Sequence, residues 1–312
     1  MDSHVTKSPD LVLTYRHTRR NSMTMGRRVF MGQVGAGVWL ASRAAWAAQS
    51  QRIERLGMQL YTVRAEMAKD FEGTLARVAA LGFREVEFAG YFDRTPQQVR
   101  MALGRNGLTS PSTHIDLASI SSRLPQIIEA SQAIGHKFIV MPWLDDATRK
   151  QPDIWQKVAD TLNRAGEASR KAGIQMAYHN HHFEFVPMAS GKMPLDFLLE
   201  RCDPQLVAFE LDLAWISAAG QDPLAYFAKY PGRFPMVHVK GLKKKPAQGA
   251  STPIDQVLPD ITDVGGDSID WARIFAKSAQ GGIKHYFVEH DVPTSAFDSL
   301  KASHDYLQAL RF

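Results

Sequence analysis

The chain has 312 residues, of which 45% are hydrophobic and 22% charged. This is the composition of an ordinary globular protein, long enough to bury a core, and it excludes a disordered chain, a collagen and a coiled coil. The single cysteine, Cys202, excludes an internal disulfide and a zinc finger built on several thiolates.

The formal net charge is +5, but the excess lies near the beginning of the chain. Residues 1–47 contain seven Lys or Arg and two acidic residues, so the remaining residues carry 30 of each sign. A neutral body lacks the single-sign field that dominates affinity for nucleic-acid phosphates. We therefore expect no nucleic-acid partner, and we interpret the run Lys243–Lys245 as part of a solvated loop.

Residues 25–48 are typical of a protein-export leader. Arg27 and Arg28 precede a short apolar stretch rich in small residues, which ends at the small-x-small site Ala45–Ala47. The paired arginines resemble a twin-arginine signal. Because the apolar stretch is shorter than the ~20 residues that cross a bilayer, we expect cleavage near Ala47, a periplasmic protein and no stable membrane anchor. The alternative is a disordered basic tail.

From residue 48 onward, short apolar segments alternate with helical patterns. Eight segments are typical of buried strands: 56–61, 84–90, 108–116, 137–143, 174–181, 206–213, 235–240 and 284–290. Between them, apolar residues recur at intervals of three and four, as in 71–81 and 154–165. Eight such repeats in about 250 residues predict one α/β domain over 48–312, a (β/α)8 TIM barrel. A doubly wound parallel sheet is the alternative.

One long irregular stretch interrupts this pattern. It covers residues 241–269 and follows the seventh predicted strand. Long irregular stretches in compact domains are often functional, so we expect a lid on the catalytic rim of the barrel.

Polar residues gather at the carboxyl ends of the last four predicted strands, where the active sites of such barrels are built. These strands supply, one each, His179, Asp212, His238 and Glu289. Adjacent strands lie ~4.8 Å apart, so the four side chains can converge on one ion. Mixed imidazole and carboxylate ligands suit one divalent ion of Zn, Mn, Co or Fe. His181 is the alternative to His179, because residues two apart on a strand face the same side.

Other residues near the strand ends are candidates for catalysis or substrate binding. Glu289 is our first choice for the base, with His181 and His114 as candidate acids. Lys240 follows His238 by two positions and could balance a developing negative charge. The candidates for contact with substrate are Glu87, Trp143, Glu184, Trp215 and Lys240.

Several of these residues also have a structural interpretation. Asp212 could cap a following helix, and Glu184 lies beyond its strand, where a carboxylate often forms a loop ion pair. Trp143 and Trp215 could provide a platform for a sugar face or could serve packing alone. Sequence alone leaves both interpretations open.

Eight blocks of the sequence together resemble the sugar phosphate isomerase/epimerase family of xylose isomerase-like TIM barrels. They are MQLYTVR (58–64), GFREVEFAGY (82–91), STHIDL (112–117), YHNHHFEF (178–185), FELDLAW (209–215), YPGRFPMVHVKG (230–241), DVGGDSIDW (263–271) and KHYFVEH (284–290). The resemblance implies a single-metal site, in which His179 stands where relatives usually carry a glutamate ligand. Asp212, His238 and Glu289 match the family ligands directly.

Three residues depart from the patterns HVKD, FVEQD and HNHDFEF that similar relatives often carry. They are Gly241, His290 and His182. These departures bear on the surroundings of the site and on substrate contacts more than on the metal.

The resemblance implies chemistry next to a sugar carbonyl, where a metal stabilises the enediolate formed by loss of a neighbouring proton. In relatives, two glutamates work on opposite faces of the sugar, whereas His179 replaces one of them here. A metal-bound imidazole whose other nitrogen carries hydrogen has no lone pair for a proton, which disfavours two-base epimerisation. We therefore expect a metal-dependent sugar isomerase/epimerase-like enzyme acting on a sugar or keto-sugar, with a 3-keto-glycoside lyase or hydratase as the alternative.

Two other classes of protein compete with these enzymes. One is a periplasmic carbohydrate-binding protein without turnover. The other is a barrel endonuclease acting at abasic sites in DNA, which the neutral body and the leader both disfavour. The sequence leaves open whether the chain forms a homo-oligomer.

Overall fold

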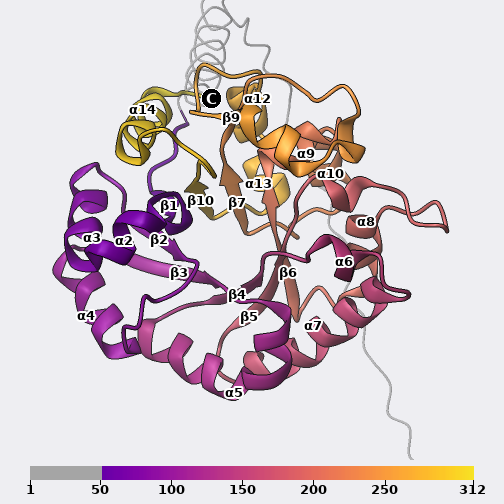
Figure 1. Cartoon of the computed structure of the whole chain (residues 1–312), viewed down its shortest axis with the longest axis horizontal. Coiled ribbons are helices and arrows are strands. Elements are labelled where there is room, and N and C mark those ends of the chain that lie inside the picture. Colours follow the sequence, from indigo (N-terminus) through magenta and orange to yellow (C-terminus); the bar gives the residue numbers. More distant parts are fainter. Residues whose placement is uncertain (1–50) are drawn as a thin grey trace, which may run out of the picture. The chain divides into compact units, whose positions relative to one another are not determined.

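The computed structural model describes residues 51–312, so the predicted leader and the boundary at residue 48 lie outside the described residues. Eight parallel strands close into a barrel in the order β1-β10-β7-β6-β5-β4-β3-β2. Helices surround this barrel (Figure 1). The predicted (β/α)8 TIM barrel is therefore confirmed, and the doubly wound alternative is wrong.

Each barrel strand lies within one of the eight predicted apolar segments. The strands are β1 Leu56–Gln59, β2 Glu85–Phe88, β3 Thr109–His114, β4 Phe138–Met141, β5 Gln175–His179, β6 Val207–Asp212, β7 Met236–Val239 and β10 His285–Val288. Every residue of β1, β2, β6 and β7 is buried. Such burial is expected for parallel strands that are covered on both faces.

The helices of the outer ring alternate with the strands. They are α2 Arg64–Lys69, α3 Phe71–Ala80, α4 Pro96–Arg105, α5 Leu117–Ile134, α6 Asp146–Arg149, α7 Ile154–Arg170, α8 Pro194–Arg201, α9 Leu213–Ala218, α10 Pro223–Lys229, α12 Trp271–Phe275, α13 Ser278–Gly281 and α14 Ala296–Ala309. Local sequence fixes their ends. At α5, for example, the Asp116 side chain accepts from the Ser119 N–H, and Gly135 ends the helix with a φ of 107°. Among residues 51–312, no helix has the length and apolar character needed to cross a membrane.

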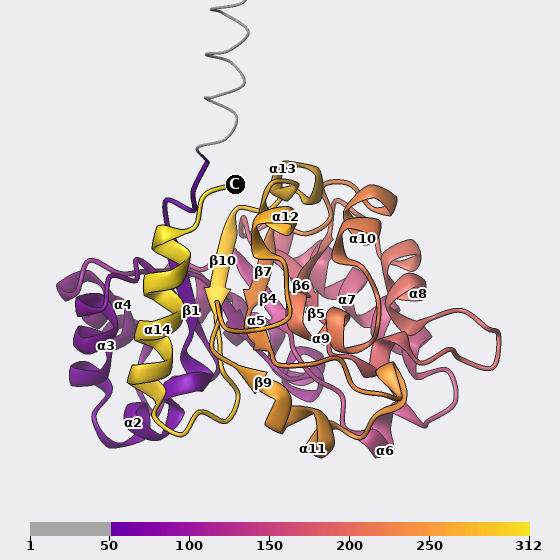
Figure 2. The ribbon, with the colours of Figure 1, turned by 90° about the horizontal axis from the view of Figure 1, so that it is seen from above.

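The 241–269 segment lies at the end of the barrel toward which the strand arrows point (Figure 2). It contains the short antiparallel pair β8 Gly241–Leu242 and β9 Ile261–Thr262, and the helix α11 Ile254–Val257. An apolar cluster joins it to α9: Ala214, Trp215, Ala218, Leu242, Val257 and Ile261. The segment is thus a packed part of the rim on which the site lies.

Of the three residues that depart from the family patterns, Gly241 belongs to this 241–269 segment, and His290 and His182 contact it. A Cβ at Gly241 would overlap the backbone oxygen of Asp263, so the position requires glycine. His290 Nδ1 lies 3.1 Å from Asp263 Oδ1, and His182 Nε2 lies 2.8 Å from the Thr252 carbonyl oxygen. The departures therefore serve the packing of the segment.

Candidate metal centre and active site

The barrel interior changes from apolar to charged along its axis. Five strands contribute an apolar cluster, namely Val140, Ala177, Ala208, Met236 and Phe287. The strands that supply the last four of these residues carry ionisable side chains two positions further along: His179, Glu210, His238 and Glu289. A further step of two reaches His181, Asp212, Lys240 and Asp291. Because side chains two apart on a strand face the same way, charged layers follow directly above an apolar plug.

Lys240 lies among three carboxylates, those of Asp212, Glu289 and Asp291. Its Nζ is 2.6 Å from Glu289 Oε2, 3.0 Å from Asp291 Oδ2 and 3.1 Å from Asp212 Oδ2. Glu289 Oε2 also lies 2.8 Å from His238 Nδ1. All of these side chains are buried or nearly so, so their mutual contacts replace those with water.

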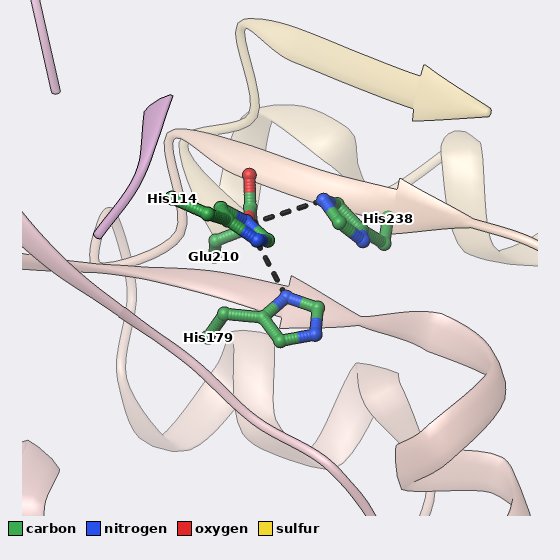
Figure 3. Close-up of side chains that lie close together, drawn as sticks. All are labelled: His114, His179, Glu210 and His238. Carbon is green, nitrogen blue, oxygen red and sulfur yellow. Dashed lines mark hydrogen bonds and ion pairs between the residues drawn. The ribbon is translucent and has the colours of Figure 1, made fainter. Parts of the chain in front are cut away.

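The other nitrogen of His238 faces a deeper group of side chains, Glu87, His114, His179 and Glu210, which we call the inner layer. His238 Nε2 lies 2.8 Å from Glu87 Oε2 and 3.2 Å from Glu210 Oε2. His114 and His179 approach Glu210 Oε2 from other sides, as Figure 3 shows, at 2.9 Å and 3.2 Å. One imidazole ring thus separates two groups of acidic side chains.

Asp212 serves both the fold and the site. Its Oδ1 accepts from the backbone N–H groups of Ala214 and Trp215 and so caps α9. Asn180 Oδ1 accepts from the backbone N–H of Asp212 at 3.0 Å, which fixes the end of β6. Asp212 Oδ2 is left to face Lys240.

The imidazoles that face the cavity differ in charge. Burial lowers the pKa of His114, but the charges of Glu87 and Glu210 outweigh it and raise the pKa to about 9. Burial and the nearby His238 lower the pKa of His179 to about 3. Burial, together with His179, holds the pKa of His181 well below its usual value. In the absence of a metal ion, His114 is therefore cationic at neutral pH, and His179 and His181 are neutral.

The carboxylates around Lys240 also differ in their pKa values. Burial raises the pKa of Glu289, but Lys240 and His238 outweigh it and hold the pKa well below the usual value. Burial dominates at Asp212 and raises its pKa to about 6, despite Lys240. The pKa of Lys240 lies well above its usual value, because the surrounding carboxylates outweigh the effect of burial. Glu289 and Lys240 are thus both ionised at neutral pH.

A cavity of about 860 Å³ opens above these layers. Its charged floor includes His114, His179, His181, Lys240, Glu289 and Asp291. Its walls include Tyr61, Trp143, Ile254, Leu258 and Val292. This volume is typical of a small-molecule site, and the 241–269 segment contributes to its wall as expected for the predicted lid.

The structure brings three of the four predicted metal ligands together: Asp212, His238 and Glu289 offer ligand atoms within 4.8 Å of one another. His179 groups instead with His114, Glu210 and His238, and its Nε2 lies 3.9 Å from Asp212 Oδ2. These donors fit a divalent ion that accepts mixed nitrogen and oxygen ligands. His179 Nδ1 is buried without a hydrogen-bond partner, and Asp212 Oδ2 has only its ion-pair contact with Lys240, so both atoms have capacity left for a metal ion.

The remaining predicted residues lie at several distances from the cavity. His114, His181, Lys240 and Trp143 line it, and the Trp143 side chain meets the His181 ring edge-on. Glu87 is buried in the inner layer, where Gln59 Nε2 donates to it.

Two predicted residues support the site from behind. Glu184 is fully buried, accepts from the Tyr178 hydroxyl and the His181 backbone N–H, and so fixes the loop after β5. Trp215 is buried on α9 and packs against the rings of His181 and His182. Both lie outside the residues that line the cavity.

Sequence reasoning missed Glu210 and Asp291. Glu210 precedes Asp212 by two positions on β6, and Asp291 follows Glu289 by two, so alternation along each strand was the available signal. The prediction took one ligand from each strand end and therefore passed over the second carboxylate on the same face.

Comparisons with known proteins agree with this architecture. A family described as xylose isomerase-like TIM barrel matches residues 75–311. The chain is similar to the inosose dehydratase of Geobacillus kaustophilus, at 26% identity over 230 residues that cover 65% of this chain and 74% of the relative. It is also similar to the inosose dehydratase of Lacticaseibacillus casei, at 24% identity over 58% of this chain and 67% of the relative.

A solved structure is similar over most of the barrel. It is a sugar phosphate isomerase/epimerase from Parabacteroides distasonis, with a TM-score of 0.65 and 27% sequence identity. The match covers 82% of this chain and 93% of that protein. Since the family match spans most of the sequence and the strands close as that family requires, the chain belongs to the xylose isomerase-like TIM barrel family.

Proposed function

We propose that the chain is a divalent-metal-dependent lyase. It removes a proton next to the carbonyl of a keto-sugar or keto-polyol and expels the oxygen substituent on the next carbon. The observation that carries the proposal is the unequal pair of groups on the cavity floor: the carboxylate of Glu289 and the cationic imidazole of His114. An elimination needs one base and one acid, and this floor offers one of each. The dehydratase names of the two curated relatives support the same reaction class.

Asp212, His238, Glu289 and His179 would hold the ion. When bound, a divalent ion supplies Lewis-acid polarisation of the substrate carbonyl. These ligands suit zinc, manganese, cobalt and iron alike, so they do not identify the metal.

Glu289 takes the proton from the carbon next to the carbonyl. It is ionised at neutral pH because of its contacts with Lys240 and His238, and it lines the cavity. The electron pair of the broken C–H bond passes into the enediolate, whose negative charge develops near the Lys240 ammonium. The other carboxylates that line the cavity, Asp116 and Asp291, are engaged in the cap of α5 and in the ion pair with Lys240, which disfavours two-base epimerisation.

His114 donates the proton that the departing oxygen needs. The electron pair of the enediolate re-forms the carbonyl, a carbon–carbon double bond forms, and the carbon–oxygen bond breaks. His181, the other acid suggested by sequence, is neutral because its pKa lies well below the usual value, so it has no excess proton to donate. It can still hydrogen-bond a substrate hydroxyl.

Isomerisation through the same enediolate is the second candidate. It is favoured by the similarity to the sugar phosphate isomerase/epimerase from Parabacteroides distasonis. The two reactions share the proton abstraction by Glu289 and differ in the next step, because isomerisation returns the proton to carbon and leaves every carbon–oxygen bond intact.

The two reactions are separated by incubating metal-loaded protein in D2O with a 3-keto-glucoside, a keto-inositol and a simple ketose. Release of the substituent or of water, with formation of an enone, supports the lyase. Deuterium incorporation without bond cleavage supports the isomerase. Absence of both, with sugar binding retained in Glu289→Gln, would show a carbohydrate-binding protein instead.

A further inference from the structure

We propose that the substrate carries an aromatic substituent and that the upper part of the cavity binds it. This upper part, which we call the mouth, is formed by Tyr61, Trp143, Ile254, Leu258 and Val292. The charged floor takes the keto-sugar ring, and the mouth takes the aromatic ring attached to it. The inference rests on the proposed function, because the substituent is the group that the elimination expels.

The large hydrophobic side chains that the protein exposes gather at this mouth. Among residues 51–312 five are exposed, and three of them, Tyr61, Trp143 and Val292, line the cavity with exposures of 42%, 38% and 50%. Single exposed hydrophobic residues are ordinary, whereas a group of them around one concave site marks a surface that a ligand covers. Covering these side chains with an apolar group removes their contact with water and so favours binding.

The two aromatic rings of the mouth are held in place before any ligand binds. The Arg64 guanidinium covers one face of Tyr61, with Cζ 4.0 Å from the ring centroid, and donates to the Tyr61 carbonyl oxygen. The Trp143 ring meets the rings of His181 and Phe183 edge-on, at centroid distances of 4.8 Å and 5.2 Å. Rings fixed in advance bind a flat partner at a lower entropic cost than mobile side chains do.

The mouth presents apolar surface from several sides. Tyr61 follows β1, Trp143 follows β4 and Val292 follows β10, and β1 and β4 are not neighbours in the barrel. Ile254 and Leu258 come from the 241–269 segment. An aromatic ring placed among these side chains exchanges water for apolar contacts on more than one side.

A second sugar unit fits the mouth less well than an aromatic ring. Sugar hydroxyls need hydrogen-bonding partners, and of the five mouth residues only Tyr61 and Trp143 have a polar group in the side chain. Three polar residues of the cavity wall, Ser119, Arg123 and Gln126, lie instead on α5. The mouth and the charged floor belong to one cavity, so a group attached to the sugar reaches the mouth without leaving the site.

A 3-keto-glucoside with an aromatic aglycone satisfies both parts of the cavity. Glu289 takes the proton from carbon 2, the bond between carbon 1 and the aglycone oxygen breaks, and a double bond forms between these two carbons. The oxygen leaves as a phenol with the proton that His114 donates, so no further reactant is needed. The cavity volume of about 860 Å³ lies in the range for drug-sized ligands, which an aryl glycoside matches in size.

The test compares 3-keto-glucosides with methyl, phenyl and glucosyl aglycones. Phenoxide leaves more readily than methoxide whatever surrounds it, so kcat does not report on the mouth. Dissociation constants are therefore measured by calorimetry with metal-loaded Glu289→Gln, which lacks the base and keeps the mouth, after its metal content is checked. Tyr61→Ser and Val292→Asp, each made in this background, alter the mouth. Met101→Ser is the matched control, because Met101 is a 53% exposed hydrophobic residue on α4 that does not line the cavity.

We expect the phenyl compound to bind about tenfold more tightly than the methyl compound, and the glucosyl compound to bind no more tightly than the methyl compound. Tyr61→Ser and Val292→Asp should reduce the phenyl preference to about threefold or less, because they replace apolar surface of the mouth with polar groups. Met101→Ser should retain the full preference. Circular dichroism checks that each variant folds, and a ratio of two dissociation constants cancels effects on the floor that both compounds share.

The inference is overturned if the phenyl compound binds no more tightly than the methyl compound, if the glucosyl compound binds most tightly, or if the mouth variants keep the full preference. Release of phenol and methanol by the wild type tests the reaction separately. Release of both without a binding preference supports the lyase and contradicts this inference. A binding preference without release of phenol supports the aromatic site and contradicts the proposed lyase.

Discussion

Lys240 Nζ lies 2.6 Å from Glu289 Oε2, which places a fixed positive charge against the carboxylate that faces the cavity. The same ammonium contacts Asp291 and Asp212, so one cation serves three buried acids. Removing one partner of a buried ion pair is strongly destabilising, because it leaves an uncompensated charge in a low-dielectric environment.

Lys240→Met should therefore lower the free energy of unfolding of metal-free protein by about 3–5 kcal/mol at pH 7. Adding a divalent ion should restore part of this loss, because the ion replaces the missing charge. Urea denaturation with and without metal measures both effects. Lys243→Met is the control: Lys243 is exposed, contacts the Pro259 carbonyl oxygen, and should change stability by less than about 0.5 kcal/mol. Equal losses in the two variants would contradict the role assigned to Lys240.

Glu289→Gln should reduce turnover by about 10³-fold, within the range for loss of a general base. The amide keeps the shape of the side chain but cannot accept the proton. Metal content measured on the same samples separates loss of the base from loss of the ion. Glu85→Gln, at the other end of the barrel, is the matched control and should retain activity. A loss below tenfold in Glu289→Gln would exclude it as the base.

Glu184 should make stability depend on pH. Burial outweighs its hydrogen bond with Tyr178 and raises the pKa of Glu184 to about 7, from 4.5. The folded state therefore binds the proton on Glu184 more tightly than the unfolded state does. The protonated carboxyl contributes fully to the free energy of unfolding below pH ~4.5, and this contribution is lost as the pH rises through ~7. The expected loss is about 3 kcal/mol for the wild type relative to Glu184→Gln. Denaturation curves at pH 4.5 and 8 measure this difference, and parallel pH profiles for the two proteins would disprove it.

Gly241→Ala should destabilise the protein by about 1–3 kcal/mol, because the added Cβ overlaps the backbone at Asp263 and lies 2.8 Å from the Thr262 carbonyl oxygen. Activity should fall as well, since the displaced 241–269 segment carries cavity residues Ile254 and Leu258. Gly266→Ala is the control in the same segment, because a Cβ there has no neighbour within 4 Å. Thermal unfolding compares the two. An unchanged melting temperature in Gly241→Ala would contradict this prediction, because it would show that the segment accommodates the added methyl group without loss of stability.

Alternation and strand counting predicted the barrel and the convergence of its last four strand ends. They could not predict the level at which each side chain lies. In the barrel register, His179 pairs with Glu210, whereas Asp212 pairs with His238. This stagger arises from the tilt of strands in a closed barrel, and no single strand encodes it. The sequence therefore indicated one group of ligands where the structure has two levels.

The positions of Trp215 and Glu184 behind the cavity also could not be predicted from a pattern along the sequence. α9 begins immediately after β6, so Trp215 lies one turn into a helix and packs beneath the 241–269 segment. Glu184 turns back toward Tyr178 through the short helical turn Phe183–Phe185. Both positions follow from contacts between distant segments, which propensity and spacing do not report.

The cap on α9 has a consequence for how Asp212 meets a ligand. Two backbone N–H groups, at 2.9 Å and 2.8 Å, hold Oδ1, so the carboxylate plane is set when the helix forms. Oδ2 is therefore already oriented when a cation or hydroxyl binds it, and binding does not have to restrict rotation of the Asp212 side chain. The entropic cost of orienting the Asp212 carboxylate is incurred during folding. Its affinity for a ligand is therefore higher than that of a freely rotating aspartate.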